Sequence, residues 1–196
     1  MIKIFIESKN SQTPEYNFLE TILRVFGYNS QPSVIVPLNG KDTLDLARNQ
    51  FIQNTVEGGT NLIIFDADTA INGGGYNIRR QEIETKLRDL HIQADIFLWP
   101  DNCNDGDFET LLESIARKDL HERFFGCFND YELCLGDEYL CPNRKGKLHT
   151  YITSMKLTNK QRNKIGAGHW LFENKDLWDL DSVNLTALKK FLSKYL

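Results

Sequence analysis

Two acidic residues, Asp66 and Asp68, stand one residue apart where an apolar run ends. The run 61–66 (NLIIFD) predicts a buried strand, and side chains two apart on a strand point the same way. Both carboxylates are therefore expected to reach one spot. Like charges held so close resist ionisation unless a cation lies between them, and hard divalent ions prefer oxygen ligands. The spacing predicts a Mg²⁺ site, at which Mn²⁺ is a second candidate ion.

A third acid, Glu7, ends another predicted strand, 2–7. Parallel strands of an open α/β sheet bring such ends to one edge, so Glu7 is expected beside the two aspartates. An isolated Asp-x-Asp pair more often ends a strand and caps a turn, because Asp favours both roles. The additional glutamate favours the metal interpretation over the turn interpretation.

Apolar runs alternate with helical patterns, which predicts an α/β fold with a Rossmann-like, mainly parallel sheet of about four strands. Strands are expected at 2–7, 33–37, 61–66 and 95–99. Helices are expected between them at 15–26, 41–55 and 78–90. Further helical patterns follow at 107–118, 119–135, 147–157 and 184–195. The chain is interpreted as a single domain, 1–196, with a core of about 1–115 and a helical extension of about 116–196.

The composition is ordinary for a water-soluble protein, with 41% hydrophobic and 26% charged residues. No apolar run approaches the roughly 20 residues that cross a bilayer, and the N-terminus lacks the pattern of a signal peptide. We therefore expect a cytoplasmic protein without a membrane partner. The four cysteines lack the paired spacings of zinc ribbons, so reduced thiols are expected.

Charge is strongly segregated along the chain, although the net charge is only −4. Residues 95–138 carry twelve acids and three bases, whereas residues 139–172 carry seven bases and no acid. A phosphate-bearing partner, either nucleic acid or a nucleotide, fits the basic stretch. The alternative is a solvated basic face that balances the acidic stretch within the same domain.

A glycine tract, 72–75 (NGGG), follows the carboxylate pair and precedes Arg79 and Arg80. Three glycines let a backbone approach a phosphate closely, and the two arginines behind it could bind the same group. The alternative is a mobile connector. A second connector, 100–102 (PDN), has the residues of a good turn that needs no chemistry.

The chain resembles a Toprim domain, the module of topoisomerases, primases and some nucleases, in the placement of Glu7 and of the Asp-Ala-Asp run. Within that group it looks similar to a prokaryotic family of unknown function related to the overcoming-lysogenisation-defect nucleases. In one respect it differs, because Ser8 follows the glutamate where those families typically have glycine. The segments that carry the resemblance are 4–8 (IFIES), 37–44 (PLNGKDTL), 63–69 (IIFDADT) and 98–112 (LWPDNCNDGDFETLL).

The resemblance implies a role for each matching residue. Asp66 and Asp68 would hold Mg²⁺, and Glu7 would serve as a ligand or as the general acid/base near the scissile phosphate. Glu109 is a candidate ligand for a second ion, and its alternative role is that of a favourable acid in a helix's first turn. A cation must also meet the phosphate. The candidates for it are, in order, Lys147, Lys145 and Lys41.

The chain is therefore predicted to be a Mg²⁺-dependent phosphoryl-transfer or nuclease-like protein that acts on nucleic acid or a nucleotide. One alternative is a non-catalytic Toprim-like module that binds a nucleotide, a nucleic acid or a partner protein. Another is a haloacid-dehalogenase-like phosphatase with Asp66 as nucleophile and Asp68 as acid/base, although the strand 95–99 does not end in the Ser or Thr it needs. The oligomeric state is left open, and a partner ATPase is compatible with the prediction.

Overall fold

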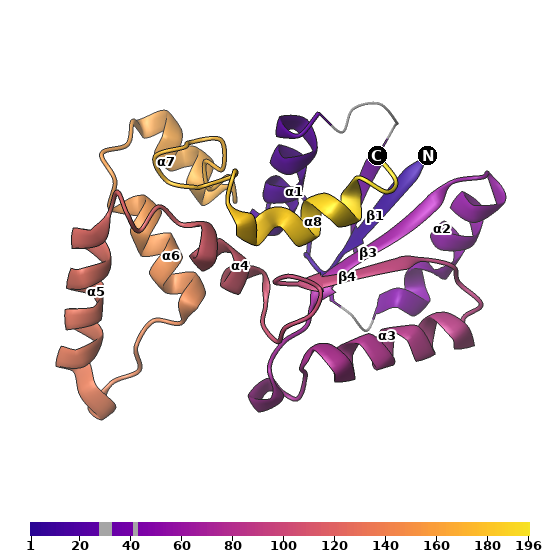
Figure 1. The fold of residues 1–196 in the computed structure, drawn as a ribbon, viewed down its shortest axis with the longest axis horizontal. Coiled ribbons are helices and arrows are strands. Elements are labelled where there is room, and N and C mark those ends of the chain that lie inside the picture. The colour runs from indigo at the N-terminus through magenta and orange to yellow at the C-terminus, as the bar shows by residue number, and fades with distance from the viewer. Residues whose placement is uncertain (28–32, 41–42) are drawn as a thin grey trace.

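The structure, a computed structural model, describes residues 1–27, 33–40 and 43–196, and a parallel four-stranded sheet forms its centre (Figure 1). The strands run in the order β2-β1-β3-β4, and all three neighbouring pairs are parallel. Their bounds are β1 (Ile2–Ile6), β2 (Ser33–Pro37), β3 (Thr60–Asp66) and β4 (Asp95–Trp99). The predicted α/β fold is confirmed, and each predicted strand end lies within one residue of its observed position.

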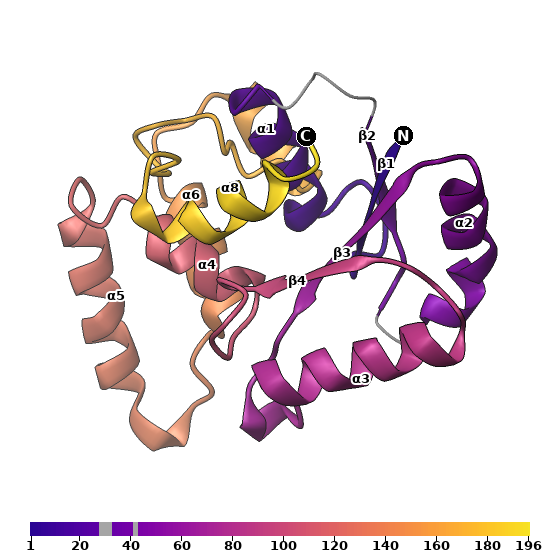
Figure 2. The same ribbon diagram turned by 45° about the vertical axis from the view of Figure 1, so that its right-hand side comes forward.

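Helices cover both faces of the sheet (Figures 1 and 2). Helix α1 (Pro14–Val25) lies on one face, and helices α2 (Leu44–Val56) and α3 (Tyr76–Asp89) lie on the other. The start of α1 is set locally, because Thr13 accepts a hydrogen bond from the third residue of the helix and proline opens its first turn. Part of the predicted helix 41–55 falls on residues 41–42, which lie outside the described residues.

The five remaining helices form a C-terminal region on the α1 side of the sheet. They are α4 (Phe108–Ile115), α5 (Glu122–Leu135), α6 (Arg144–Thr153), α7 (Asn159–Gly166) and α8 (Thr186–Leu192). Short 3₁₀ turns lie at Ala70–Asn72, Gly136–Glu138 and Val183–Leu185. Helix α7 was not predicted from the sequence, because its only buried residue is Ile165 and a single apolar position gives no periodicity.

Alternate side chains of each strand enter two separate hydrophobic clusters. In β1, Ile4 and Ile6 face the larger cluster, which includes α1 and the C-terminal helices. Phe5 faces the smaller cluster and stacks on Phe51 of α2, with 3.6 Å between the ring centroids. Because both faces of the sheet are buried, the strands are continuous apolar runs in the sequence.

Within the described part of the chain, no helix is long and apolar enough to cross a membrane. The four cysteines are all free and exposed.

Candidate functional site

The carboxyl ends of β1 and β3 meet at a point where the chain connections diverge. After β1 the chain continues into α1 on one face of the sheet, and after β3 it continues into α3 on the opposite face. In open α/β sheets, ligands bind in the crevice outside such a switch point. Glu7 directly follows β1 and Asp66 ends β3, so the structure brings these two predicted site residues together.

A cleft of about 490 Å³ opens at this switch point. Its charged lining consists of four carboxylates and two ammonium groups from residues described by the structure. These residues are Glu7, Glu15, Asp66, Glu109, Lys9 and Lys145. Four of the six were predicted from the sequence, whereas Glu15 and Lys9 were not. Glu15 could have been found from its place in the first turn of the helix that follows Glu7, because that turn begins at the same edge of the sheet.

Backbone groups hold the carboxylate of Asp66 at the centre of the cleft. The N–H of Phe108 donates to Asp66 Oδ1 over 2.7 Å. Phe108 is the first residue of α4, where backbone N–H groups lack helical partners and the helix dipole favours a negative charge. The N–H of Asp66 in turn donates to Glu7 Oε2 over 3.4 Å. The first backbone N–H of α4 thus fixes Oδ1 of Asp66.

Two side chains from separate parts of the fold hold the partly buried carboxylate of Glu15. The hydroxyl of Ser8 donates to Oε2 over 2.6 Å, and the indole N–H of Trp99 donates to Oε1 over 2.8 Å. The serine that follows Glu7 therefore orients an additional acid in the cleft.

The carboxylates of the cleft disfavour one another's ionisation. Burial raises the pKa of Glu15 to about 7, with repulsion from Glu7 and Glu109 adding to the effect and the Ser8 and Trp99 hydrogen bonds opposing it. Burial, followed by repulsion from Glu15, Glu7 and Glu109, raises the pKa of Asp66 well above its ordinary value, although the Phe108 N–H acts in the opposite direction. Such perturbed groups in a cleft are typical of functional sites.

Lys145 is the predicted phosphate-binding cation that does reach the cleft. Its Nζ atom lies 3.3 Å from Glu109 Oε1, and its side chain is 58% exposed, whereas that of Glu109 is 16% exposed. An exposed ammonium beside a half-buried carboxylate can leave its partner for an incoming anion, because such surface pairs are held by little energy.

Asp68, which was expected beside Asp66, is held by a different partner in the structure. Strand β3 ends at Asp66, and the backbone of Asp68 is left-handed, with φ of 59°. Alternation of side chains holds only while the strand continues. The carboxylate of Asp68 lies 2.5 Å from Nη2 of Arg79, and Asp68 is absent from the described residues that line the cleft.

The two arginines predicted to bind phosphate are engaged elsewhere. Arg79 is 2% exposed and pairs with Glu82 over 2.6 Å as well as with Asp68. Arg80 pairs with Glu84 over 2.7 Å and lines a different cavity, at the amino ends of β3 and β4. Neither guanidinium lies among the described residues of the cleft.

The glycine tract serves close packing of its own turn. A side chain at Gly74 would lie 2.5 Å from Cβ of Asp68, and Gly75 has φ of 110°, a conformation that favours glycine. The carboxylate of Asp105 accepts a 2.7 Å hydrogen bond from the N–H of Tyr76. An acid of the chain itself thus lies at the start of α3, the place considered for a phosphate.

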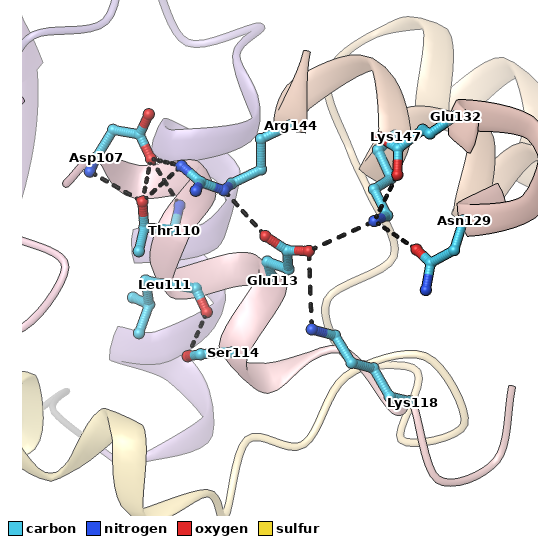
Figure 3. Close-up of polar contacts among 10 residues, drawn as sticks. All are labelled: Asp107, Thr110, Leu111, Glu113, Ser114, Lys118, Asn129, Glu132, Arg144 and Lys147. Carbon is cyan, nitrogen blue, oxygen red and sulfur yellow. Dashed lines mark hydrogen bonds and ion pairs between the residues drawn. The ribbon is translucent and has the colours of Figure 1, made fainter. Parts of the chain in front are cut away.

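Lys147, the first candidate for a catalytic cation, lies at a helix junction instead of the cleft (Figure 3). Its Nζ atom is 3.6 Å from Glu132, 3.9 Å from Glu113 and 3.4 Å from Oδ1 of Asn129. These contacts join α6 to α4 and α5. Lys41, the third candidate, lies outside the described residues.

Three cations converge on Glu113 at the same junction (Figure 3). Nε of Arg144 lies 2.9 Å from Glu113, and the ammonium groups of Lys118 and Lys147 lie 3.7 and 3.9 Å away. Arg144 also contacts Asp107 over 3.3 Å. At this junction, two of the seven bases of the basic stretch, Arg144 and Lys147, therefore face acids of the acidic stretch within the chain, as the balancing interpretation expected.

The connector after β4 is the turn that its sequence predicted. Asp101 Oδ1 accepts hydrogen bonds from the N–H groups of Cys103 and Asn104 at 3.1 and 2.8 Å. Asn102 adopts a left-handed backbone, and its side chain accepts a bond from the N–H of Leu98 over 3.1 Å. Asp and Asn stabilise such turns through these local bonds.

Across residues 1–27, 33–40 and 43–196, no group of three or more His, Cys, Asp or Glu side chains is already arranged to hold a metal ion. The donors in the cleft are nevertheless all carboxylates, which suit a hard divalent cation. In the comparisons with known proteins, no family model, curated protein or solved structure matches this chain.

Proposed function

We propose that the protein is a Mg²⁺-dependent phosphoryl-transfer or nuclease-like enzyme with a Toprim-like core, acting on nucleic acid or a nucleotide. The observation that carries the proposal is the convergence of Glu7, Asp66, Glu109 and Glu15 in one cleft at the switch point of the sheet. Glu7 and Asp66 stand at the strand ends where the resemblance implies acids. A cytoplasmic location belongs to the same proposal.

The chemistry of the cleft fits a divalent cation. Carboxylate oxygens are the ligands that Mg²⁺ and Mn²⁺ prefer, and a cation would relieve the repulsion that raises the pKa values of Asp66 and Glu15. Asp66, Glu7 and Glu109 are the residues that would hold the ion, which requires them to come closer together than they lie in the described structure. A bound ion would stabilise the charge that develops on the phosphoryl group.

The residues of the cleft divide the remaining tasks. Asp66 is oriented by the Phe108 N–H and presents its carboxylate to the cation. Glu7 serves as a further ligand or as general acid/base. Glu15, with a pKa of about 7, can hold or release a proton on its carboxyl oxygens at neutral pH. Lys145 attracts the phosphate of the substrate toward the cleft.

A non-catalytic module that binds a nucleotide, a nucleic acid or a partner protein is the second candidate function. It is favoured by one observation, namely that the described acids are not arranged as a metal site in advance. The phosphatase alternative is opposed by the pairing of Asp68 with Arg79, because that mechanism needs the second aspartate to face the substrate beside Asp66.

The proposal is tested by calorimetric titration of Mg²⁺ and Mn²⁺ into the wild type, Asp66→Asn and Asp130→Asn. Asp130 is an exposed acid of α5 and provides a matched control for the loss of one carboxylate. Single- and double-stranded DNA and RNA, and nucleoside triphosphates, are incubated with each protein in parallel. We expect binding and turnover by the wild type and the control, and loss of both in Asp66→Asn.

Two other outcomes have definite meanings. Metal binding by the wild type without turnover of any substrate would favour the binding module. Failure of the wild type to bind either ion would refute the metal-dependent function.

A further inference from the structure

Asp68 and Arg79 form a contact that ties the turn after β3 to α3. Nη2 of Arg79 lies 2.5 Å from Oδ2 of Asp68, and Nη1 lies 2.6 Å from Oε2 of Glu82. The guanidinium is almost fully buried, with 2% of Arg79 exposed, whereas the Asp68 side chain is 31% exposed. The carboxylate of Asp68 is therefore a principal counter-charge of a buried cation.

That pairing makes Asp68 a poor donor for an ion in the cleft. A buried guanidinium whose partner is removed is strongly destabilised, because its charge then has neither water nor a counter-ion. Nε of Arg79 already has no hydrogen-bond partner among the described residues. If Asp68 turned toward the cleft, only Glu82 would remain paired with Arg79, and the buried cation would lose more of its compensation.

The backbone of Asp68 is also fixed in place. Its φ of 59° is a left-handed conformation, which Asp and Asn adopt more readily than most residues. Its C=O accepts a 2.8 Å hydrogen bond from the N–H of Gly106, in the loop between β4 and α4. On the other side, Gly74 approaches so closely that a Cβ atom there would lie 2.5 Å from that of Asp68.

These contacts lead directly to the acid at the centre of the cleft. Gly106 stands two residues before Phe108, and the N–H of Phe108 holds Asp66 over 2.7 Å. The turn of Asp68 therefore fixes one end of the short loop segment whose other end orients Asp66.

We infer that Asp68 is a positioning residue: with Arg79 it fixes the Gly106–Phe108 segment that orients Asp66, and it is not itself a cation ligand. The inference rests on the proposed function for the role of Asp66, and it departs from the role that the family resemblance implies for the second aspartate. Arg79 is a positioning residue by the same argument, since it acts through Asp68.

The first test uses the metal-free protein. Hydrogen exchange of backbone amides and thermal melting are measured for Asp68→Ala, Arg79→Met and the double variant. We expect faster exchange at Gly106 and Phe108 in each single variant. The loss of melting temperature in the double variant should be well below the sum of the two single losses, because both changes remove one shared contact. Arg80→Met removes a neighbouring ion pair on the same helix and is the matched control, with unchanged exchange at those two amides.

The second test measures Mn²⁺ binding by electron paramagnetic resonance. In Asp68→Asn the amide oxygen can still accept from Arg79, Glu82 still supplies a negative charge, and Asn tolerates the left-handed backbone. We therefore expect its affinity to stay closer to that of the wild type than the affinity of Asp68→Ala does. Asp68→Ala and Arg79→Met should each weaken binding by about tenfold, the low end for loss of an outer supporting contact. Loss of binding in Asp68→Asn, or tighter binding in Arg79→Met, would overturn the inference, because either result identifies Asp68 as a ligand for which Arg79 competes.

The two proposals fail in different ways. If the wild type binds no Mn²⁺, the proposed function fails, and the exchange experiment still decides whether the Asp68–Arg79 contact positions Gly106 and Phe108. If the wild type binds Mn²⁺ while exchange at these amides is unchanged in both single variants, the inference fails and the proposed function stands.

Discussion

Two groups of acids in this molecule have opposite surroundings. In the cleft, Glu7, Glu15 and Asp66 repel one another, and the pKa values of two of them are raised. At the junction of α4, α5 and α6, a single carboxylate, Glu113, attracts the three cations Arg144, Lys118 and Lys147 (Figure 3). Repulsion in the cleft destabilises the folded state, whereas attraction at the junction stabilises it.

The difference separates a binding site from a structural contact. Residues of α4 and α6 contribute to both places, Glu109 and Lys145 at the cleft and Glu113 and Arg144 at the junction. In the cleft, four carboxylates share one space with two ammonium groups among the described residues, and repulsion between the acids is a condition that a ligand cation would relieve. Counts of charged residues along the sequence do not reveal which acids lie close to other acids in the folded protein.

The largest expected effect that would sharpen this comparison is the pH dependence caused by Glu15. The pKa of Glu15 is raised from 4.5 to about 7 in the folded protein. The contribution of Glu15 to the free energy of unfolding is therefore fully present below pH 4.5 and is lost as the pH rises through about 7. A shift of this size corresponds to about 3 kcal/mol. Glu15→Gln lacks the titrating group and can keep both hydrogen bonds, so above pH 7 it should melt higher by about 6–12 °C.

The check is a series of thermal melts between pH 4.5 and 8 without divalent ions. Glu113→Gln serves as the control, because its acid is already compensated by cations and its removal should not raise the melting temperature at pH 8. If the melting temperatures of the wild type and Glu15→Gln changed with pH in the same way, ionisation of Glu15 would not destabilise the folded protein.

The next effect in size is stabilisation by Mg²⁺. A ligand that binds only the folded state at a hundred times its dissociation constant adds about 2.7 kcal/mol of stability. We expect the melting temperature of the wild type and of Glu113→Gln to rise with Mg²⁺, and that of Asp66→Asn to stay constant. A rise of equal size in Asp66→Asn would place the ion outside the cleft.

A smaller effect is expected at the junction itself. Glu113→Gln should lower the free energy of unfolding by about 1 kcal/mol, the upper range for a partly exposed ion-pair network. Because salt screens this attraction, the loss should shrink in chemical denaturation at high ionic strength. Salt should have the opposite influence on the cleft, where it screens repulsion and stabilises the metal-free wild type. A loss that is independent of salt would contradict the ionic interpretation of the junction.

The smallest expected effect on stability concerns Lys145, which joins the two groups of acids through α6. Its pair with Glu109 is largely exposed, so Lys145→Met should change the free energy of unfolding by only about 0.3 kcal/mol. Binding of pyrophosphate in the presence of Mg²⁺ should nevertheless weaken. Lys160→Met, on the exposed side of α7, is the matched control and should bind as the wild type does. Equal binding by both variants would remove Lys145 from the proposed site.

The sheet could be predicted from the sequence because both faces of each strand are buried. Continuous apolar runs such as 61–66 therefore stand out, and the edge at which Glu7 and Asp66 meet follows from parallel strands alone. Helix α7 could not be predicted, since it buries only Ile165 and leaves no periodic pattern.

The cleft was only partly predictable, for reasons that lie in particular residues. The pairing of Asp68 with Arg79 could not be predicted, because Asp68 has a left-handed backbone beyond the end of the strand, where the alternation of side chains no longer applies. Lys147 was misplaced because its helix turns it toward α5, where it also lies over the ring of Phe128. Glu15 depends on contacts with Ser8 and Trp99, which are 7 and 84 residues away in the sequence.

The larger hydrophobic cluster has a consequence for how the molecule unfolds. Phe191 of α8 contacts Phe97 of β4, with 5.4 Å between the ring centroids, and Trp178 pairs through its backbone with Ala116 at the end of α4. The sheet and the C-terminal helices therefore share one apolar interior. A break in the chain after residue 115 would expose that interior on both fragments, so the two parts constitute a single cooperative unit that gains or loses its structure together.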